Sequence, residues 1–154
     1  MDLYSFIIQN KETLKLIYAL MIVFISVLIV VKTDKLFRIS LHNGIRYFRN
    51  AFLFYAVAFS TRYFLDFLFD ERIFPEYNFI LNPLFEFFLI MAGFFLLYSL
   101  IWKRFEVPGK KKRSSLFNPR ILILYILTLV IVLLDFLWNV YYFMFLSQII
   151  VFLF

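Results

Sequence analysis

Four long runs of apolar residues divide this chain, and most of its charged residues lie between them. A helix needs about 20 apolar residues to cross the hydrocarbon core of a bilayer, which is about 30 Å thick. Lipid offers the backbone no hydrogen-bond partners, so runs of this length are expected to be helices. The pattern predicts an all-α polytopic integral membrane protein, a helical bundle that forms a single transmembrane domain over residues 1–154. The predicted spans cover about 14–31, 45–69, 79–102 and 121–137.

The last apolar run is too long for one perpendicular crossing. It extends from Ile121 to Phe154, and as a single helix it would be about 51 Å long. Either the chain turns near Asp135–Asn139 and returns as a fifth span, or one tilted helix extends to residue 154. Neither Gly nor Pro stands near the midpoint to make a tight turn, which favours the single long helix. The chain stops on apolar residues without a flanking charge, so we expect it to be a piece of a longer protein.

Basic residues are concentrated in two stretches between the predicted spans. Residues 32–49 contain five Lys or Arg against one acidic residue, and residues 103–120 contain seven against one. Together the two stretches hold 12 of the 16 basic residues, in a chain of net charge +6. Cytoplasmic loops of membrane proteins carry such an excess of Lys and Arg. We therefore expect a multi-pass protein with both basic loops in the cytoplasm and the N-terminus outside.

The densest basic run is Lys110-Lys111-Lys112-Arg113. Its first interpretation is topological, because it would hold the loop in the cytoplasm. Binding to anionic lipid headgroups is a compatible second role, since each basic residue near such a surface contributes about 1 kcal/mol. We expect no nucleic-acid binding from so short a run tethered at a membrane. The expected partners are the lipid bilayer, anionic headgroups at the basic loops, and either further copies of this chain or a larger membrane complex.

Composition narrows the function classes further. Hydrophobic residues make up 64% of the chain and charged residues only 17%, too few to cover a water-facing surface, which excludes a soluble enzyme. There is no Cys and a single His, His42, so thiolate chemistry and multi-histidine metal sites are excluded within one chain. Phosphate-binding glycine loops and hydrolase motifs are absent from the sequence as well. We expect no metal and no cofactor, and a non-enzymatic role is favoured.

Four ionisable residues fall inside the predicted spans, where each costs about 2.5–3.5 kcal/mol at a helix centre. Counting along the helices places Arg62, Glu86 and Asp135 at similar depths, about 9–10 Å from the outer end. An i,i+4 spacing places each polar pair on one helix face. The predicted intramembrane polar cluster consists of Arg62, Asp66, Asn82, Glu86, Asp135 and Asn139.

Three interpretations of this cluster are open. In the first, Arg62 and the carboxylates line a polar cavity that opens to the outside, and the surplus negative charge holds a proton or a cation. In the second, they form a structural ion pair that joins the helices. In the third, the helix begins at Pro83, and Glu86 merely complements the dipole of its first turn.

Two functions remain after these exclusions. The first is a non-enzymatic helical membrane module for signal input or assembly within a larger membrane protein or complex. The alternative is a small oligomeric proton or cation transporter or channel that uses the outer-leaflet cluster of carboxylates and arginine. Four or five helices are few for a pathway in one chain, so this alternative needs a dimer. A membrane enzyme acting on lipids is the least supported reading, because nothing in the sequence specifies a substrate.

Overall fold

The protein is built from helices. The computed structural model describes residues 10–40, 43–68, 77–105, 119–138 and 140–153. They contain no β-strand. Their helices are α2 (Lys11–Ser40), α3 (Asn43–Leu68), α4 (Tyr77–Phe105), α5 (Pro119–Trp138) and α6 (Tyr142–Leu153). The predicted all-α bundle is therefore confirmed.

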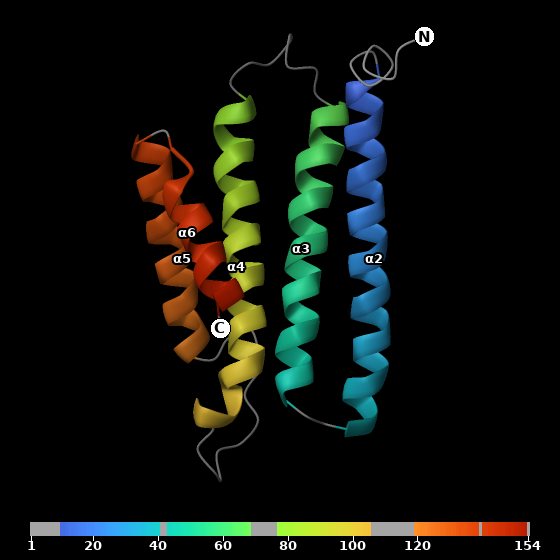
Figure 1. Ribbon diagram of the computed structural model, residues 1–154, viewed down its shortest axis with the longest axis vertical. Helices are drawn as coiled ribbons and strands as arrows, with labels where there is room; N and C mark the ends of the chain where they lie inside the picture. Colours follow the sequence, from blue (N-terminus) through green and yellow to red (C-terminus); the bar gives the residue numbers. More distant parts are fainter. Residues whose placement is uncertain (1–9, 41–42, 69–76, 106–118, 139, 154) are drawn as a thin grey trace.

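Helix α4 joins two parts of the bundle. Helices α2, α3 and α4 stand side by side, and α5 and α6 lie on the other side of α4 (Figure 1). Within the described residues, the backbone of α3 packs along both α2 and α4, whereas α5 and α6 pack mainly on α4 and on each other. Side chains of α5 also reach α3, where the rings of Phe54 and Tyr125 lie 6.5 Å apart between centroids. The beginning of α2, the end of α3, the beginning of α4 and the turn between α5 and α6 all lie at one end of the bundle (Figure 1). We call this end the α5–α6 turn end.

Three of the described helices contain segments that are long and apolar enough to cross a membrane, as expected of a membrane-embedded protein. These segments are Thr13–Ile39 of α2, Phe79–Ile101 of α4 and Ile121–Trp138 of α5. Helix α3 contains most of the predicted span 45–69, and its 26 residues give a length of about 39 Å. Helix α3 also carries three arginines, and it is not among the three segments that are apolar enough to span a membrane.

The first basic stretch is mostly helical. Only two residues separate α2 from α3, so residues 32–49 do not form the extended loop that the charge pattern predicted. Asp34 of α2 accepts a hydrogen bond from Nε of Arg38, at 3.0 Å and one turn away, and it also pairs with Arg49 of α3. The first pair supports the end of α2 as an i,i+4 contact does, and the second ties α2 to α3.

Helix α4 begins earlier than its proline suggested. It starts at Tyr77, and Pro83 lies inside the helix, where a proline removes one backbone hydrogen bond. Glu86 is therefore nine residues beyond the first residue of α4. The interpretation that placed Glu86 in a first turn beginning at Pro83 is wrong, because the dipole effect of a helix end fades within one turn.

An aromatic core fills the half of the bundle away from the α5–α6 turn end. Buried residues of α3, α4 and α5 form it: Tyr47, Ala51, Met91, Phe95, Tyr98 and Ile121. Tyr47 and Tyr98 meet edge to face at 4.7 Å between ring centroids, and Phe54 stacks on Phe95 at 5.2 Å. Offset and edge-on geometries of this kind are the favourable ones for aromatic pairs. These contacts join α3, α4 and α5 through apolar side chains at this level.

The last apolar run forms two helices, so the prediction of a single long helix is wrong. Helix α5 ends at Trp138, and α6 begins at Tyr142 and folds back along α4 and α5 (Figure 1). The break lies where the alternative interpretation put a turn, near Asp135–Asn139. Helix α6 has 12 residues, a length of about 18 Å, which is short of the roughly 30 Å that a full crossing requires.

Candidate functional site

Asp135 builds the turn between α5 and α6. Its backbone carbonyl accepts a hydrogen bond from the amide of Val140 at 3.1 Å. Its carboxylate accepts two more, from the amides of Phe143 at 3.1 Å and Met144 at 2.8 Å. The first amides of a helix have no partner within the helix, and a carboxylate there also meets the positive end of the helix dipole. One residue thus ends α5 and caps α6, in place of the Gly or Pro that the sequence lacks.

Arg62 of α3 is held by α4. Its Nη1 donates a hydrogen bond to Oδ1 of Asn82 at 3.2 Å, and its guanidinium carbon lies 4.9 Å from the ring centroid of Phe85. A guanidinium over an aromatic face is a favourable cation–π contact. Within the described part of the chain, Arg62 forms no ion pair with a carboxylate. Among these residues Arg62 is held by an amide and a ring, and its predicted pairing with Asp66 stays a prediction because the Asp66 side chain is not described.

Glu86 occupies a different situation from Asp135. Only 4% of its surface is exposed, against 2% for Asp135. Asp135 uses both carboxylate oxygens in hydrogen bonds, whereas the Glu86 carboxylate makes no hydrogen bond or ion pair with any residue that the structure describes. Burying a charge without an ion-pair or hydrogen-bond partner costs free energy. The role of Glu86 therefore has to be sought in the space that its carboxylate faces.

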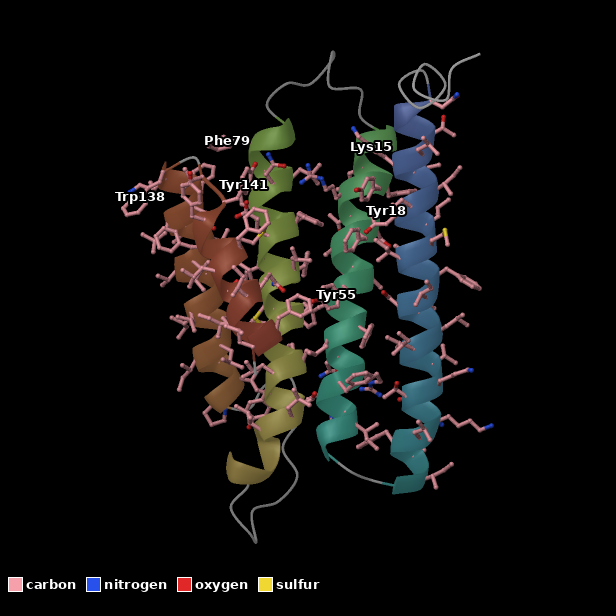
Figure 2. The ribbon with its side chains drawn as sticks, viewed as in Figure 1. Lys15, Tyr18, Tyr55, Phe79, Trp138 and Tyr141 are labelled. Atoms are coloured by element: carbon pink, nitrogen blue, oxygen red, sulfur yellow. The ribbon has the colours of Figure 1, made fainter. Side chains whose placement is uncertain are left out.

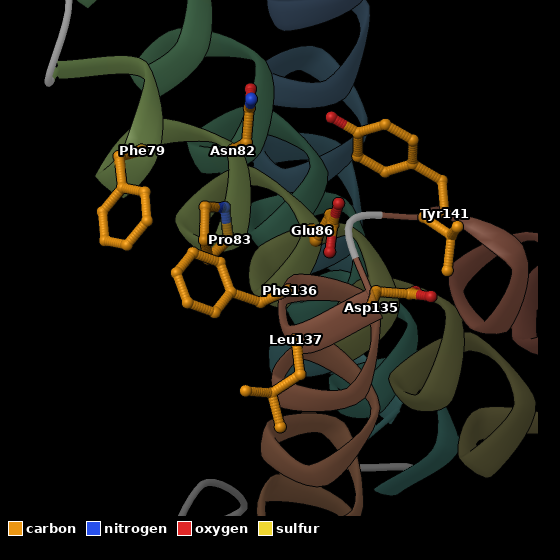
Figure 3. A pocket seen from close by; sticks show the side chains of 9 residues that line it. Phe79, Asn82, Pro83, Glu86, Asp135, Phe136, Leu137 and Tyr141 are labelled. Carbon is orange, nitrogen blue, oxygen red and sulfur yellow. The ribbon is translucent and has the colours of Figure 1, made fainter.

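Glu86 and Asp135 line one cavity of about 360 Å³ at the α5–α6 turn end. One wall comes from α4, the other from the end of α5 and the turn that follows it (Figure 3). The lining residues are Phe79, Asn82, Pro83, Glu86, Asp135, Phe136, Leu137, Val140 and Tyr141. The rings of Phe79 and Phe136 meet edge to face at 4.6 Å between centroids, and Figure 2 shows Phe79, Trp138 and Tyr141 at the same end of the bundle as Lys15 of α2.

The cavity ends on packed side chains of α4. Below Glu86, the side chains of Ile90, Met91 and Phe95 are fully buried. Thr128 of α5 donates to the sulfur of Met91 at 3.1 Å and to the carbonyl of Leu124 at 2.8 Å. The first of these contacts joins α5 to α4, and the second lies within α5. The buried side chains and the contact to Met91 pack α4 against α5 beyond Glu86, so the cavity has a floor.

Helix α6 closes the side of the same region. Nε2 of Gln148 donates to the backbone carbonyl of Leu89 at 3.2 Å. Gly93 lies beneath α6, and a Cβ atom there would come within 3.2 Å of Gln148 and 3.3 Å of Val151. Small residues allow such a close approach of two helices in a membrane. The absence of a side chain at Gly93 therefore sets how deeply α6 can lie against α4.

The structure brings part of the predicted polar cluster together. Asn82, Glu86 and Asp135 line one cavity, and Arg62 reaches its edge through Asn82. The remaining predicted positions lie outside the described residues or have side chains that are not described: Asp66, Asn139, His42, Lys110, Lys111, Lys112 and Arg113. Sequence reasoning missed the aromatic walls and Gly93. Phe79 and Phe136 carry no signal among 24 phenylalanines, whereas Gly93, one of three glycines in an apolar chain, marks a close helix contact.

No protein-family model, curated protein or solved structure matches this chain. Its class therefore comes from its own geometry, which is that of a helical membrane-embedded protein with a polar, aromatic-walled cavity at one end. Among the described residues, no group of three His, Cys, Asp or Glu is arranged to hold a metal ion.

Proposed function

We propose that this chain is a non-enzymatic membrane module that serves signal input or assembly within a larger membrane protein or complex. In this proposal α3 crosses the bilayer together with α2, α4 and α5, the N-terminus lies outside, and the basic stretches 32–49 and 103–120 face the cytoplasm. The observation that carries the proposal is the cavity with a floor. A binding site that opens at one end and stops on packed apolar side chains suits a protein that receives something better than one that conducts it.

The use made of the other polar side chains supports the same proposal. Arg62 joins α3 to α4, Gln148 joins α6 to α4, and Asp135 joins α5 to α6. Hydrogen bonds between helices contribute about 0.6 kcal/mol each on average in a membrane. These hydrogen bonds therefore fix the helices relative to one another. A module that transmits a change of shape needs such connections, because a helix that moves must move its neighbours.

Helix α2 supplies the surface through which such a module would assemble. Only 11% of the residues in its apolar segment are buried, against 39% for α4. Its exposed apolar residues recur at helical spacing along one side: Ile17, Leu20, Phe24, Leu28 and Val31. A stripe of this kind contacts either lipid or a helix of another chain, and the two can be distinguished by experiment.

Cysteine crosslinking tests the assembly proposal, because the natural chain has no Cys. Phe24→Cys introduces a thiol at a position that is 64% exposed, and Ser26→Cys introduces one at a position that is 4% exposed and faces α3. We expect disulfide crosslinks from Phe24→Cys in native membranes at expression levels that keep the chain dilute, and none from Ser26→Cys. Failure of Phe24→Cys, and of each other stripe position, to crosslink to any protein would contradict assembly through α2.

Labelling of introduced cysteines also tests the proposed orientation. Ser114→Cys lies next to the run Lys110–Arg113, and a membrane-impermeant maleimide should label it only after the membrane is opened. Labelling of Ser114→Cys from outside intact cells would contradict the proposed topology. Binding of the basic loop to anionic headgroups is checked separately, by comparing vesicles with and without phosphatidylserine.

The alternative is an oligomeric proton or cation transporter or channel, and one observation favours it. Glu86 is buried in the cavity without a described partner, as a proton or ion carrier would be. Reconstitution into liposomes with a pH-sensitive or ion-sensitive dye separates the two functions. We expect flux no greater than that of empty liposomes, and a flux that Glu86→Gln abolishes would establish the alternative.

A further inference from the structure

We infer that the cavity between α4 and the α5–α6 turn is a binding site for a small organic ammonium cation. The inference deepens the proposed function, because such a cation would be the input that the module receives, and to that extent it rests on that function. Binding itself is a separate claim that can be measured on the purified chain.

The walls of the cavity have the composition that such a cation requires. Three aromatic rings, those of Phe79, Phe136 and Tyr141, line it together with aliphatic side chains. The ring faces attract a cation, and aromatic lining is the usual device for binding quaternary ammonium groups. A volume of about 360 Å³ lies at the lower end of the range of small-molecule sites, which suits a molecule of a few carbon atoms around one nitrogen.

The charged groups around the cavity include more carboxylates than cations, and one carboxylate has no hydrogen bond or ion pair among the described residues. Of the described charged groups that face this region, Asp135 is engaged by the first amides of α6, and Arg62 is engaged by Asn82 and Phe85. Glu86 is the third: it lines the cavity, 4% of its surface is exposed, and its carboxylate forms no hydrogen bond or ion pair with a described residue, although Arg62 is near enough to act on it electrostatically. With both carboxylates ionised, these described groups carry a net charge of −1, which a monovalent cation would neutralise.

The donor set disfavours an inorganic ion. Calcium takes six to eight oxygen ligands, and magnesium requires a near-ideal octahedron. Both oxygens of Asp135 already accept backbone amides, and Oδ1 of Asn82 already accepts from Arg62. Among the described side chains that line the cavity, the Glu86 carboxylate and the Tyr141 hydroxyl are the oxygens with no hydrogen bond, which is fewer than the ligands that either ion takes. An organic ammonium ion needs no such set of ligands, because its alkyl groups contact the apolar walls while its charge meets Glu86.

The test uses the purified full chain in nanodiscs of zwitterionic lipid, titrated with tetramethylammonium chloride at constant ionic strength against sodium and potassium chloride. We expect saturable binding of tetramethylammonium by calorimetry, and no comparable binding of sodium or potassium. Glu86→Gln keeps the shape of the side chain and removes its charge, so we expect binding to weaken at least about tenfold, a change that calorimetry resolves readily.

A matched pair of aromatic variants keeps the test informative if Glu86→Gln fails to fold. Phe136→Leu retains an apolar wall and removes the ring, and we expect it to weaken binding about two- to fivefold. Phe145→Leu changes a phenylalanine of α6 that is 60% exposed and does not line the cavity, and we expect it to bind as the natural chain does. Equal effects of the two variants would overturn the inference.

Three further results would overturn it. The first is equal binding midpoints for tetramethylammonium and sodium. The second is unchanged tetramethylammonium binding in a folded Glu86→Gln variant. The third is a response to pH alone without saturable binding of any cation, which would indicate a proton site. The inference and the proposed function can fail separately. If tetramethylammonium binds but leaves the Phe24→Cys crosslinks unchanged, signal input through α2 is contradicted and the binding site stands. If the crosslinks form but no cation binds, only the binding site is contradicted.

Discussion

The two halves of α4 have similarly apolar sequences and different surroundings. The half near the α5–α6 turn end lines the cavity with Asn82 and Glu86. The other half packs Met91 and Phe95 into an aromatic core between α3 and α5. Hydrophobicity does not distinguish the halves, because both lie in one segment that is apolar enough to span a membrane.

The difference between the halves follows from the size and polarity of a few side chains. Ala51, Ala92 and Gly93 let the helices approach closely in the packed half, and tight van der Waals packing is what holds helices together in lipid. In the cavity half, Pro83 removes a donor from the backbone and Glu86 introduces a charge. The comparison teaches that small residues mark where a membrane helix packs, and polar residues mark where the packing opens.

The largest expected effect is in the packed half. Phe95→Ala should lower the free energy of unfolding by about 3 kcal/mol or more, because it leaves a hole in a rigid core. Unfolding in mixed detergent micelles, monitored by circular dichroism, measures this loss. Phe145→Ala, at an exposed position of α6, is the matched control and should change stability little. Similar losses for the two variants would contradict the core described here.

Removing the cap of α6 should have the second largest effect. Asp135→Ala leaves the amides of Phe143 and Met144 without their acceptor, and we expect a loss of about 2 kcal/mol. Hydrogen exchange should show α6 losing protection while α2 and α3 keep theirs. Undiminished protection of residues 142–153 would mean that α6 does not depend on Asp135.

Filling the contact beneath α6 should have an intermediate to small effect. Gly93→Leu adds a side chain where even a Cβ atom would lie within 3.3 Å of Gln148 and Val151. We expect α6 to be displaced at a cost of about 1–2 kcal/mol. A spin label on α6 at Phe152, which is exposed, paired with one on α4, should report a longer distance. An unchanged distance would show that α6 is not seated on Gly93.

Substitution of Glu86 should have the smallest effect on stability. It also tests most directly whether the cavity half of α4 differs from the packed half. Glu86→Gln removes a buried charge that has no described partner, so stability should change by less than about 0.5 kcal/mol, or rise slightly. The measurement is the same detergent unfolding, with Asp135→Asn beside it as the carboxylate that is engaged. A loss for Glu86→Gln as large as that for Asp135→Asn would mean that Glu86 holds the bundle together instead of serving the cavity.

The helical bundle could be predicted because its physical cause is local in the sequence. Long apolar runs have only one way to satisfy the backbone in lipid, and the helices follow. The break before Tyr142 could not be predicted in the same way, because its cap comes from a side chain on α5, eight and nine residues before the amides that it accepts. Turn rules search for Gly, Pro or a polar residue within the turn itself, whereas this acceptor lies on the preceding helix.

The composition of the site was predictable only in part, for a related reason. Spacing along a helix gives depth and face, and on that basis Glu86 and Asp135 were expected near one level. Residue spacing does not give the rotation of one helix about its axis relative to the next. That rotation brings Arg62 of α3 to Asn82 and to the ring of Phe85 on α4. The proposed contributions of Asp66 and Asn139 to the cluster stay predictions.

The turn held by Asp135 also ties two motions together. Helix α6 cannot tilt away from α4 without either breaking the bonds from Asp135 to Phe143 and Met144 or pulling on the end of α5. Phe136 and Tyr141, which flank that turn, are also walls of the cavity. A movement of α6 would therefore also move a wall of the cavity.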